Sequence, residues 1–215
     1  MVDRGDALSR TETKQWRSRN HETPAMKHPS SEELFAHWRD RRGARMAPER
    51  GDIDPGAIRK ALGDAFLLGL DTETDPAFRL AGTRVCALFC RELKGETFLT
   101  LWDNEDRGAV RDLLAVVSEE MIGLVAGIDA RTREGLRADL ELLLLPLRHR
   151  GRRQLRMIGT LAPLEPPFWL GSAPVERMQL RAWRHLGPAA EANRLPRLVP
   201  GSRRHGLIVH DGDLS

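Results

Sequence analysis

Cys86 and Cys90 are the only cysteines of the 215-residue sequence, and they stand four positions apart. On a helix this spacing puts both thiols on one face, where they could support redox chemistry or a covalent adduct with a flavin. Cys86, however, lies in the segment Arg-Val-Cys-Ala-Leu-Phe, without the preceding Asn and the following Gln that accompany the reactive cysteine of flavin-binding light sensors. Because free cysteine is among the most buried residue types, we expect both to be small apolar core residues.

A run of basic residues near position 150 could bind anions. It lies on a predicted hairpin tip and includes Arg148, Arg150, Arg152 and Arg153. Guanidinium groups suit phosphates and cyclic dinucleotides, so nucleotide or nucleic-acid binding is one interpretation. An ordinary solvated turn is the other, and it is the usual explanation of such runs. The formal net charge of +3 does not by itself indicate a nucleic-acid partner, which we do not expect.

The histidines and the known catalytic signatures support neither a haem, nor a metal site, nor an enzyme. Histidine stands at positions 21, 28, 37, 149, 185, 205 and 210, and none lies between residues 82 and 120, where a haem ligand would be expected. His205 and His210 are five apart, a spacing that points them to opposite faces of a strand. The sequence has no G-x-S-x-G, no H-E-x-x-H and no phosphate-binding loop. We therefore expect a protein without catalytic residues, metal, flavin or haem.

Periodicity predicts the elements that would position these residues. Strands are expected at residues 65–71, 77–81, 121–131, 136–148 and 154–162, and helices at about 54–62, 83–94 and 105–121. In the fourth strand Leu and charged residues alternate, which indicates one solvated face, until the alternation fails at Leu143. Pro146 removes a ladder donor, so a bulge or an edge is expected there. The predicted fold class is α+β, with an antiparallel five-stranded sheet and helices over one face.

A separate helix is predicted before the first strand. Ser30 and Glu33 form a capping box, and the helix that follows runs out at Gly43. An amphipathic flanking helix outside the core leaves apolar area that a monomer rarely exposes. We therefore predict a homodimer whose interface contains Leu34, Phe35 and Trp38.

Three segments carry a resemblance to a known family. They are HWRDRRGARMAPERGDIDPGAIRKALGDAFLL, then RLAGTRVCALFCRELKG, and finally LLLPLRHRG, in this order along the chain. Over roughly residues 31–166 the sequence resembles the single-domain PAS proteins of proteobacteria. The resemblance implies a PAS sensory or interaction fold, associated in some members with motility and cell-cycle signalling. It implies no catalytic residues.

In a fold of this kind a ligand would lie between the sheet and the helices. The registers predict mainly apolar walls, so the ligand is expected to be small and mainly hydrophobic. Arg79 either faces solvent or reaches into the pocket as an anion anchor, and the solvent-facing interpretation is preferred. The predicted lining consists of Phe66, Leu68, Arg79, Leu80, Thr83, Cys86, Phe89, Phe98 and Leu142.

Length and composition favour one main domain with tails. The sequence is 40% hydrophobic and 30% charged, which suffices for one core but leaves little for a second. Residues 1–29 are polar and predict a flexible arm, residues 30–166 the domain with its flanking helix, and residues 167–215 an extension that docks to bury its aromatic residues. No secretory segment and no apolar run of ~20 residues is present, so we expect a cytoplasmic protein that does not cross a membrane.

These observations predict a non-catalytic sensory or adaptor protein of bacterial signalling. It would bind a small ligand or a protein partner and pass the signal on through protein contacts, because the chain holds no recognisable output domain. The alternative is a basic regulator that binds a nucleotide or nucleic acid through the arginine-rich hairpin at residues 148–156. A strong salt dependence of binding would distinguish that alternative.

Overall fold

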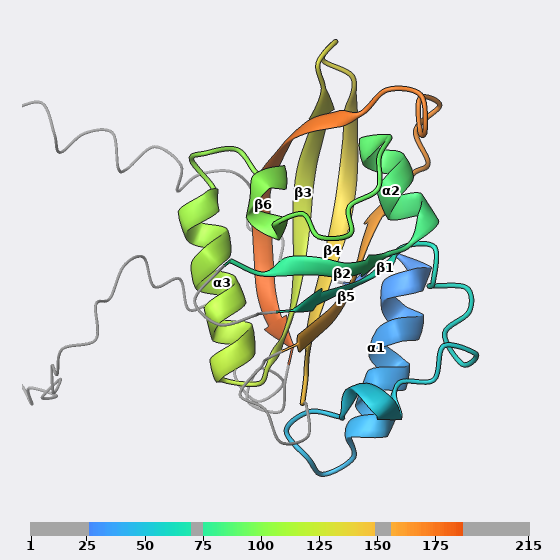
Figure 1. Ribbon diagram of the computed structural model, residues 1–215, viewed down its shortest axis with the longest axis vertical. Coiled ribbons are helices and arrows are strands. Elements are labelled where there is room, and N and C mark those ends of the chain that lie inside the picture. Colours follow the sequence, from blue (N-terminus) through green and yellow to red (C-terminus); the bar gives the residue numbers. More distant parts are fainter. Residues whose placement is uncertain (1–25, 70–74, 149–155, 187–215) are drawn as a thin grey trace, which may run out of the picture.

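The computed structural model describes residues 26–69, 75–148 and 156–186, and its centre is one antiparallel sheet (Figure 1). The strands follow the spatial order β2-β1-β5-β4-β3-β6. Their bounds are β1 Ala65–Gly69, β2 Ala77–Ala81, β3 Gly123–Thr132, β4 Arg137–Leu147, β5 Arg156–Pro163 and β6 Val175–Leu186. The α+β class and the antiparallel pairing are as predicted, but the sheet has six strands rather than five.

The sixth strand comes from the segment expected to be a C-terminal extension. β6 pairs antiparallel with β3 along its length, from Gly123 opposite Leu186 to Thr132 opposite Val175. It forms one edge of the sheet, and β2 forms the other. The extension therefore docks on the sheet as far as residue 186, while its remainder and the predicted arm up to residue 25 lie outside the described residues.

Within the described residues, three α-helices and two short 3₁₀ helices surround the sheet. They are α1 Pro29–Arg42, α2 Thr83–Phe89, α3 Arg107–Glu119, η2 Arg50–Asp52 and η3 Phe98–Leu101. α1 ends at Gly43, which has the positive φ of 55° that suits glycine at a helix C-terminus. Residues 55–64 form successive turns instead of the predicted helix, beginning where the Asp54 carboxylate accepts the Gly56 N–H.

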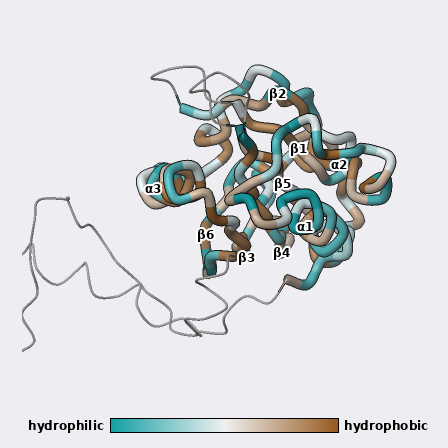
Figure 2. Tube along the Cα trace, turned by 90° about the horizontal axis from the view of Figure 1, so that it is seen from below, coloured by the Kyte–Doolittle hydropathy of each residue, from teal (hydrophilic) through white to brown (hydrophobic). Residues whose placement is uncertain are grey.

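Both faces of the sheet carry a buried core. The inner core lies between the sheet and α2, η3 and α3, and includes Phe66, Leu68, Phe78, Phe89, Phe98, Trp102, Leu113 and Leu142. The outer core lies between the sheet and α1 with the turns after it, and includes Leu34, Trp38, Ile58, Leu67, Val125, Leu143, Leu145 and Leu147. Figure 2 shows the strands enclosed between α1, α2 and α3. The helices of the domain, α2 and α3, therefore lie over one face as predicted, and the flanking helix α1 covers the other face, for which no cover was predicted.

This second core explains why the alternation fails near the end of β4. Leu143, Leu145 and Leu147 face α1, while Leu142 and Leu144 face the inner core, so every residue from 140 to 147 is buried. A strand covered on both faces has no reason to alternate. The near-continuous leucine run was the sequence signal of a second covered face.

Pro146 lies in a central strand instead of an edge. β4 is paired with β3 only up to Leu144, whereas its pairing with β5 continues through Pro146 opposite Met157. The missing N–H of Pro146 therefore falls beyond the end of the β3 ladder, where no ladder bond needs it. Its carbonyl accepts a hydrogen bond of 2.8 Å from the Trp38 indole of α1.

The predicted homodimer interface is corrected by the same packing. Leu34 and Trp38 are buried within their own chain by the outer core, and Phe35 stacks on Trp38 with ring centroids 6.2 Å apart. The apolar side of α1 is therefore covered by its own sheet. Leu34 and Trp38 are not available to a second copy while α1 is docked.

Candidate functional site

Five of the predicted pocket residues do meet in the inner core. Phe66, Leu68, Phe89, Phe98 and Leu142 are all buried there, on elements from β1 to β4. The Phe98 ring lies 5.8 Å from the Phe66 ring between centroids, and other rings pack against it at similar distances. Edge-to-face and offset contacts of this kind fill space efficiently. The space expected to hold a ligand is thus occupied by aromatic side chains.

Leu80 was expected in the pocket and is instead 52% exposed. The pairing of β1 with β2 shifts between Leu67 and Leu68, so that Leu67 faces Leu80 while Leu68 faces Phe78. Such a bulge inserts one extra residue, here Arg79, and reverses the side of the sheet on which the following residue points. Leu80 therefore shares the outer side with Leu67.

Three further predicted pocket residues lie away from the inner core. Arg79 and Thr83 are exposed, and Cys86 is half-buried. Burial raises the pKa of the Cys86 thiol, and the nearby Glu92 carboxylate, 3.8 Å from the sulfur, raises it as well. A raised pKa disfavours the nucleophilic thiolate.

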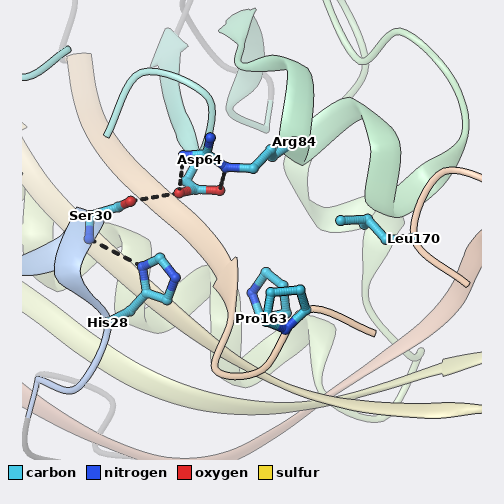
Figure 3. Close-up of a pocket in the computed structure, with 7 residues that line it drawn as sticks. His28, Ser30, Asp64, Arg84, Pro163 and Leu170 are labelled. Atoms are coloured by element: carbon cyan, nitrogen blue, oxygen red, sulfur yellow. Dashed lines mark hydrogen bonds and ion pairs between the residues drawn. The ribbon is translucent and has the colours of Figure 1, made fainter. Parts of the chain in front are cut away.

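An open cavity of about 220 Å³ lies elsewhere, at the meeting point of α1, β1, α2 and the β5–β6 connection (Figure 3). We call it the Asp64 cleft. Its lining consists of His28, Ser30, Asp64, Arg84, Pro163, Pro166 and Leu170. These residues come from four separated segments of the chain, and proline and leucine side chains form its apolar wall.

The buried carboxylate of Asp64 organises the polar side of the cleft. It accepts a hydrogen bond of 2.6 Å from the Ser30 hydroxyl and is bound by Arg84 through Nε at 2.7 Å and Nη2 at 2.6 Å. Asp64 is almost fully buried, whereas the Arg84 side chain is about half exposed. The hydrogen bond from Arg84 to Asp64 raises the pKa of the guanidinium. The charges of Arg84 and Asp64 therefore neutralise each other, and the cleft they line is almost neutral and mainly apolar.

Local sequence places each partner. Ser30 is the second residue of α1, whose N-cap is His28, with the Ser30 N–H donating to His28 Nδ1 at 3.2 Å. The predicted capping box is thus not formed, because the Ser30 hydroxyl binds Asp64 and the Glu33 carboxylate accepts the Ala61 N–H. Arg84 is the second residue of α2, in the Gly-Thr-Arg turn. The sequence did not predict this cleft, because the pattern around each residue is already explained by its own helix or turn.

Phe168 stands beside the cleft and is 89% exposed. It lies between Pro166 and Leu170, both of which line the cavity. Leu164 in the same connection is also exposed. An aromatic side chain this exposed next to an apolar cleft is a feature of interaction surfaces.

The arginine-rich hairpin is described only at its start. Arg148 is exposed, and its backbone pairs with the segment before η2, donating to the Pro48 carbonyl and accepting from the Arg50 N–H. Arg150, Arg152 and Arg153 lie outside the described residues. Anion binding at this hairpin stays a prediction.

Comparison with known proteins agrees with this architecture. A family model described as a PAS domain matches residues 26–162, so the chain belongs to the PAS domain family. One similar solved structure is an RNA-binding Light-Oxygen-Voltage receptor, with 21% identity and a TM-score of 0.39. That match covers 54% of this chain and 35% of the receptor chain, so this chain spans about a third of it. No curated protein matches the chain.

Within the three described ranges, none of the helices has the length and apolar character needed to cross a bilayer. In the same part of the chain, no three histidine, cysteine, aspartate or glutamate side chains gather as metal ligands.

Proposed function

We propose that this PAS domain protein is a non-catalytic adaptor that binds a protein signalling partner through the Asp64 cleft and Phe168. The observation that carries the proposal is the contrast between two spaces. The inner core is filled by stacked rings, whereas the cleft is open, apolar and flanked by an exposed aromatic side chain. Of the two modes expected for such a protein, these features favour protein contact over capture of a small ligand.

The chemistry of the cleft supports an apolar anchor from the partner. Its volume of about 220 Å³ suits a single side chain, and its only charges are neutralised by each other. Interfaces derive most of their affinity from a few apolar or aromatic anchors that fill such pockets. Phe168 would supply the reciprocal anchor from this side of the interface.

Binding at the cleft would also reach α1. His28 and Ser30 at the start of this helix form one lip of the cleft, and Asp64 holds the helix from the sheet side. A partner that prefers one placement of these residues would shift the equilibrium between docked and released α1. The signal would thereby pass from the cleft to the outer face without any chemical step.

Photo-crosslinking in cells tests the proposal. A crosslinking phenylalanine analogue at position 168 should capture one defined protein, while the same analogue at the exposed position Met46 should not. With that partner purified, Leu170→Glu in the cleft should weaken binding about tenfold or more, the range of a lost interface anchor. The proposal fails if position 168 captures only what position 46 captures, or if Leu170→Glu binds as well as the parent.

Native mass spectrometry separates the adaptor role from its competitors. The protein should retain no apolar small molecule, and a stoichiometric retained ligand of that kind would contradict the preference for protein contact. We further propose a cytoplasmic location and a homodimer, the dimer forming through a surface other than Leu34 and Trp38. The mass of the assembly at tens of micromolar tests the dimer, and a monomer there would refute it.

A further inference from the structure

Four arginines gather on the outer side of the sheet near the β3–β4 turn, at the top of Figure 1. Arg131 of β3 pairs directly with Arg137 of β4 on one side and with Arg177 of β6 on the other. Their neighbours Ala130, Ala138 and Met178 belong to the inner core, so strand alternation turns these three arginines to the outer side. Arg181 joins them at a bulge of β6. We call Arg131, Arg137, Arg177 and Arg181 the arginine row.

One buried carboxylate binds three of the four arginines of the row. Oδ2 of Asp129 accepts hydrogen bonds from Nη2 of Arg131 at 3.1 Å, of Arg137 at 2.5 Å and of Arg181 at 2.6 Å. Burial raises the pKa of Asp129, but the hydrogen bonds from the three guanidinium groups outweigh it and hold the pKa well below its usual range. Asp129 is therefore a permanent anion that draws three guanidinium groups to one point.

The positive charge of the row exceeds what its carboxylates neutralise. Asp139 lies 3.7 Å from Arg181 and is mostly exposed, and Arg177 has no hydrogen-bond or ion-pair partner among the described residues. Like charges directly opposite each other across strands destabilise a sheet. The three arginines bound to Asp129 keep about half of their side chains in solvent, so most of their N–H donors remain available.

We propose that the arginine row binds a diphosphate group. Arg137, Arg131 and Arg177 occupy three neighbouring strands about 4.8 Å apart, so their backbones span about 10 Å. The guanidinium groups of Arg131 and Arg137 meet at Asp129, and with Arg177 beside them they offer enough donors for two linked phosphates. Each guanidinium group matches the oxygens of a phosphate, and Asp129 positions those of Arg131, Arg137 and Arg181 in advance, while Arg177 adds a further donor group. The site lies at the opposite end of β4 from the hairpin at residues 148–156, and it does not depend on the proposed partner binding at the cleft.

Titration with inorganic pyrophosphate tests the site. We expect saturable changes in the side-chain Nε–H resonances of Arg131, Arg137 and Arg181, and a concentration-dependent rise in melting temperature. Sodium chloride at matched ionic strength should produce neither. Signals that drift without saturation, or that chloride reproduces, would overturn the proposal.

Three variants separate a binding role from a structural one. Arg177→Gln removes a side chain without a described partner, so it should fold normally and yet weaken pyrophosphate about tenfold. Asp139→Asn removes a repelling charge at the rim and should tighten pyrophosphate severalfold. Arg111→Gln, an exposed arginine paired with Asp75 away from the row, removes the same charge and should leave the affinity unchanged. Equal losses in Arg177→Gln and Arg111→Gln would show a general charge effect and refute the site.

The source of the diphosphate is resolved by comparing pyrophosphate with a nucleoside diphosphate. Equal affinity means that the phosphates alone are recognised, and tighter binding of the nucleotide means that the rest of that molecule is recognised too. Failure of the nucleotide to compete with bound pyrophosphate would contradict a shared diphosphate site.

Discussion

On the inner side of the sheet, Phe98 stacks among the rings of Phe66, Phe78 and Trp102, and nearly all contacts are apolar. On the outer side, α1 itself contributes only two deeply buried apolar residues, Leu34 and Trp38, and it also buries Ser30 and Ser31. α1 is therefore attached in large part by polar bonds. We therefore expect the inner side to contribute most of the free energy of unfolding, and the polar bonds on the outer side to fix the position of α1.

Several polar bonds hold the N-terminal end of α1. The Ser31 and Thr160 hydroxyls share a buried hydrogen bond of 2.9 Å. The buried Glu141 carboxylate accepts the backbone N–H groups of Lys27 and His28 at 2.7 and 3.1 Å. Each such bond contributes only about 1 kcal/mol net, but losing one partner leaves a buried polar group unsatisfied. A helix held in this way is specific in its placement and less costly to release than the inner core is to open.

The largest expected effect is on the inner side. Phe98→Ala removes the ring at the centre of the aromatic cluster and should lower the free energy of unfolding by about 3–5 kcal/mol. Urea denaturation measures the change. Phe168→Ala, at an exposed position, should stay within about 0.5 kcal/mol of the parent. A Phe98→Ala protein as stable as the parent would mean that the inner core is not the centre of stability.

Asp64→Ala tests the attachment of α1. The buried Ser30 hydroxyl loses its acceptor, so the free energy of unfolding should fall by about 2 kcal/mol. Hydrogen exchange of α1 amides should accelerate while the amides of β1 and β5 stay protected. The matched control is Asp75→Ala, which removes an exposed ion pair with Arg111 and should change stability little. Uniform acceleration across the sheet would contradict separate release of α1.

How far the sequence predicted this fold can be seen in individual elements. α3 matches its predicted range closely, because it has one buried and one exposed side and therefore a clear periodicity. β2 occupies the predicted residues 77–81, although a bulge breaks its alternation. The placement of α1 was missed because a pattern shows which residues are buried but not what covers them. Leu80 was misplaced because a bulge in the β1–β2 pairing leaves no mark in the local pattern.

The candidate sites depended on contacts between distant segments. Asp64 binds Ser30 across 34 positions and Arg84 across 20, so no local motif connects them. In the arginine row, Arg177 and Arg181 lie beside Arg131 only because β6 pairs with β3, a strand pair absent from the predicted five-stranded sheet. Both sites depend on which strands and helices pack together, and periodicity along the sequence does not predict that.

Two tryptophans allow a matched comparison of the two sides. Trp38 of the outer core donates from Nε1 to the Pro146 carbonyl, whereas Nε1 of Trp102 in the inner core is buried without a partner among the described residues. Replacement by phenylalanine removes the same volume at both positions. Trp38→Phe should therefore cost about 1–2 kcal/mol more than Trp102→Phe, because only the first leaves a buried carbonyl unsatisfied. Equal losses in urea denaturation would show that the outer hydrogen bond contributes nothing.

The smallest expected effect separates the two sides by pH. His185 of β6 pairs with Leu124 of the inner core and is half-buried, and its Nε2 has no hydrogen-bond partner in the described ranges. Burial lowers its pKa, against an opposing effect of Glu120. Below the unfolded pKa of about 6.5 the unfolded chain binds a proton that the folded state resists, so stability is lost as pH falls from there toward the folded pKa.

On the outer side the corresponding window lies at lower pH. The pKa of Asp129 is depressed in the folded state, so its contribution is complete above the unfolded value of about 3.9 and is lost as pH falls through the folded value. His185→Gln should accordingly flatten the decline of unfolding free energy between about pH 6.5 and 5 and leave the acid decline below about pH 4 unchanged. Equilibrium denaturation of parent and variant across this range measures both. If the unfolding free energy of the variant falls as steeply with pH as that of the parent above pH 5, then His185 is solvated in the native state. The buried inner core would then not extend to β6.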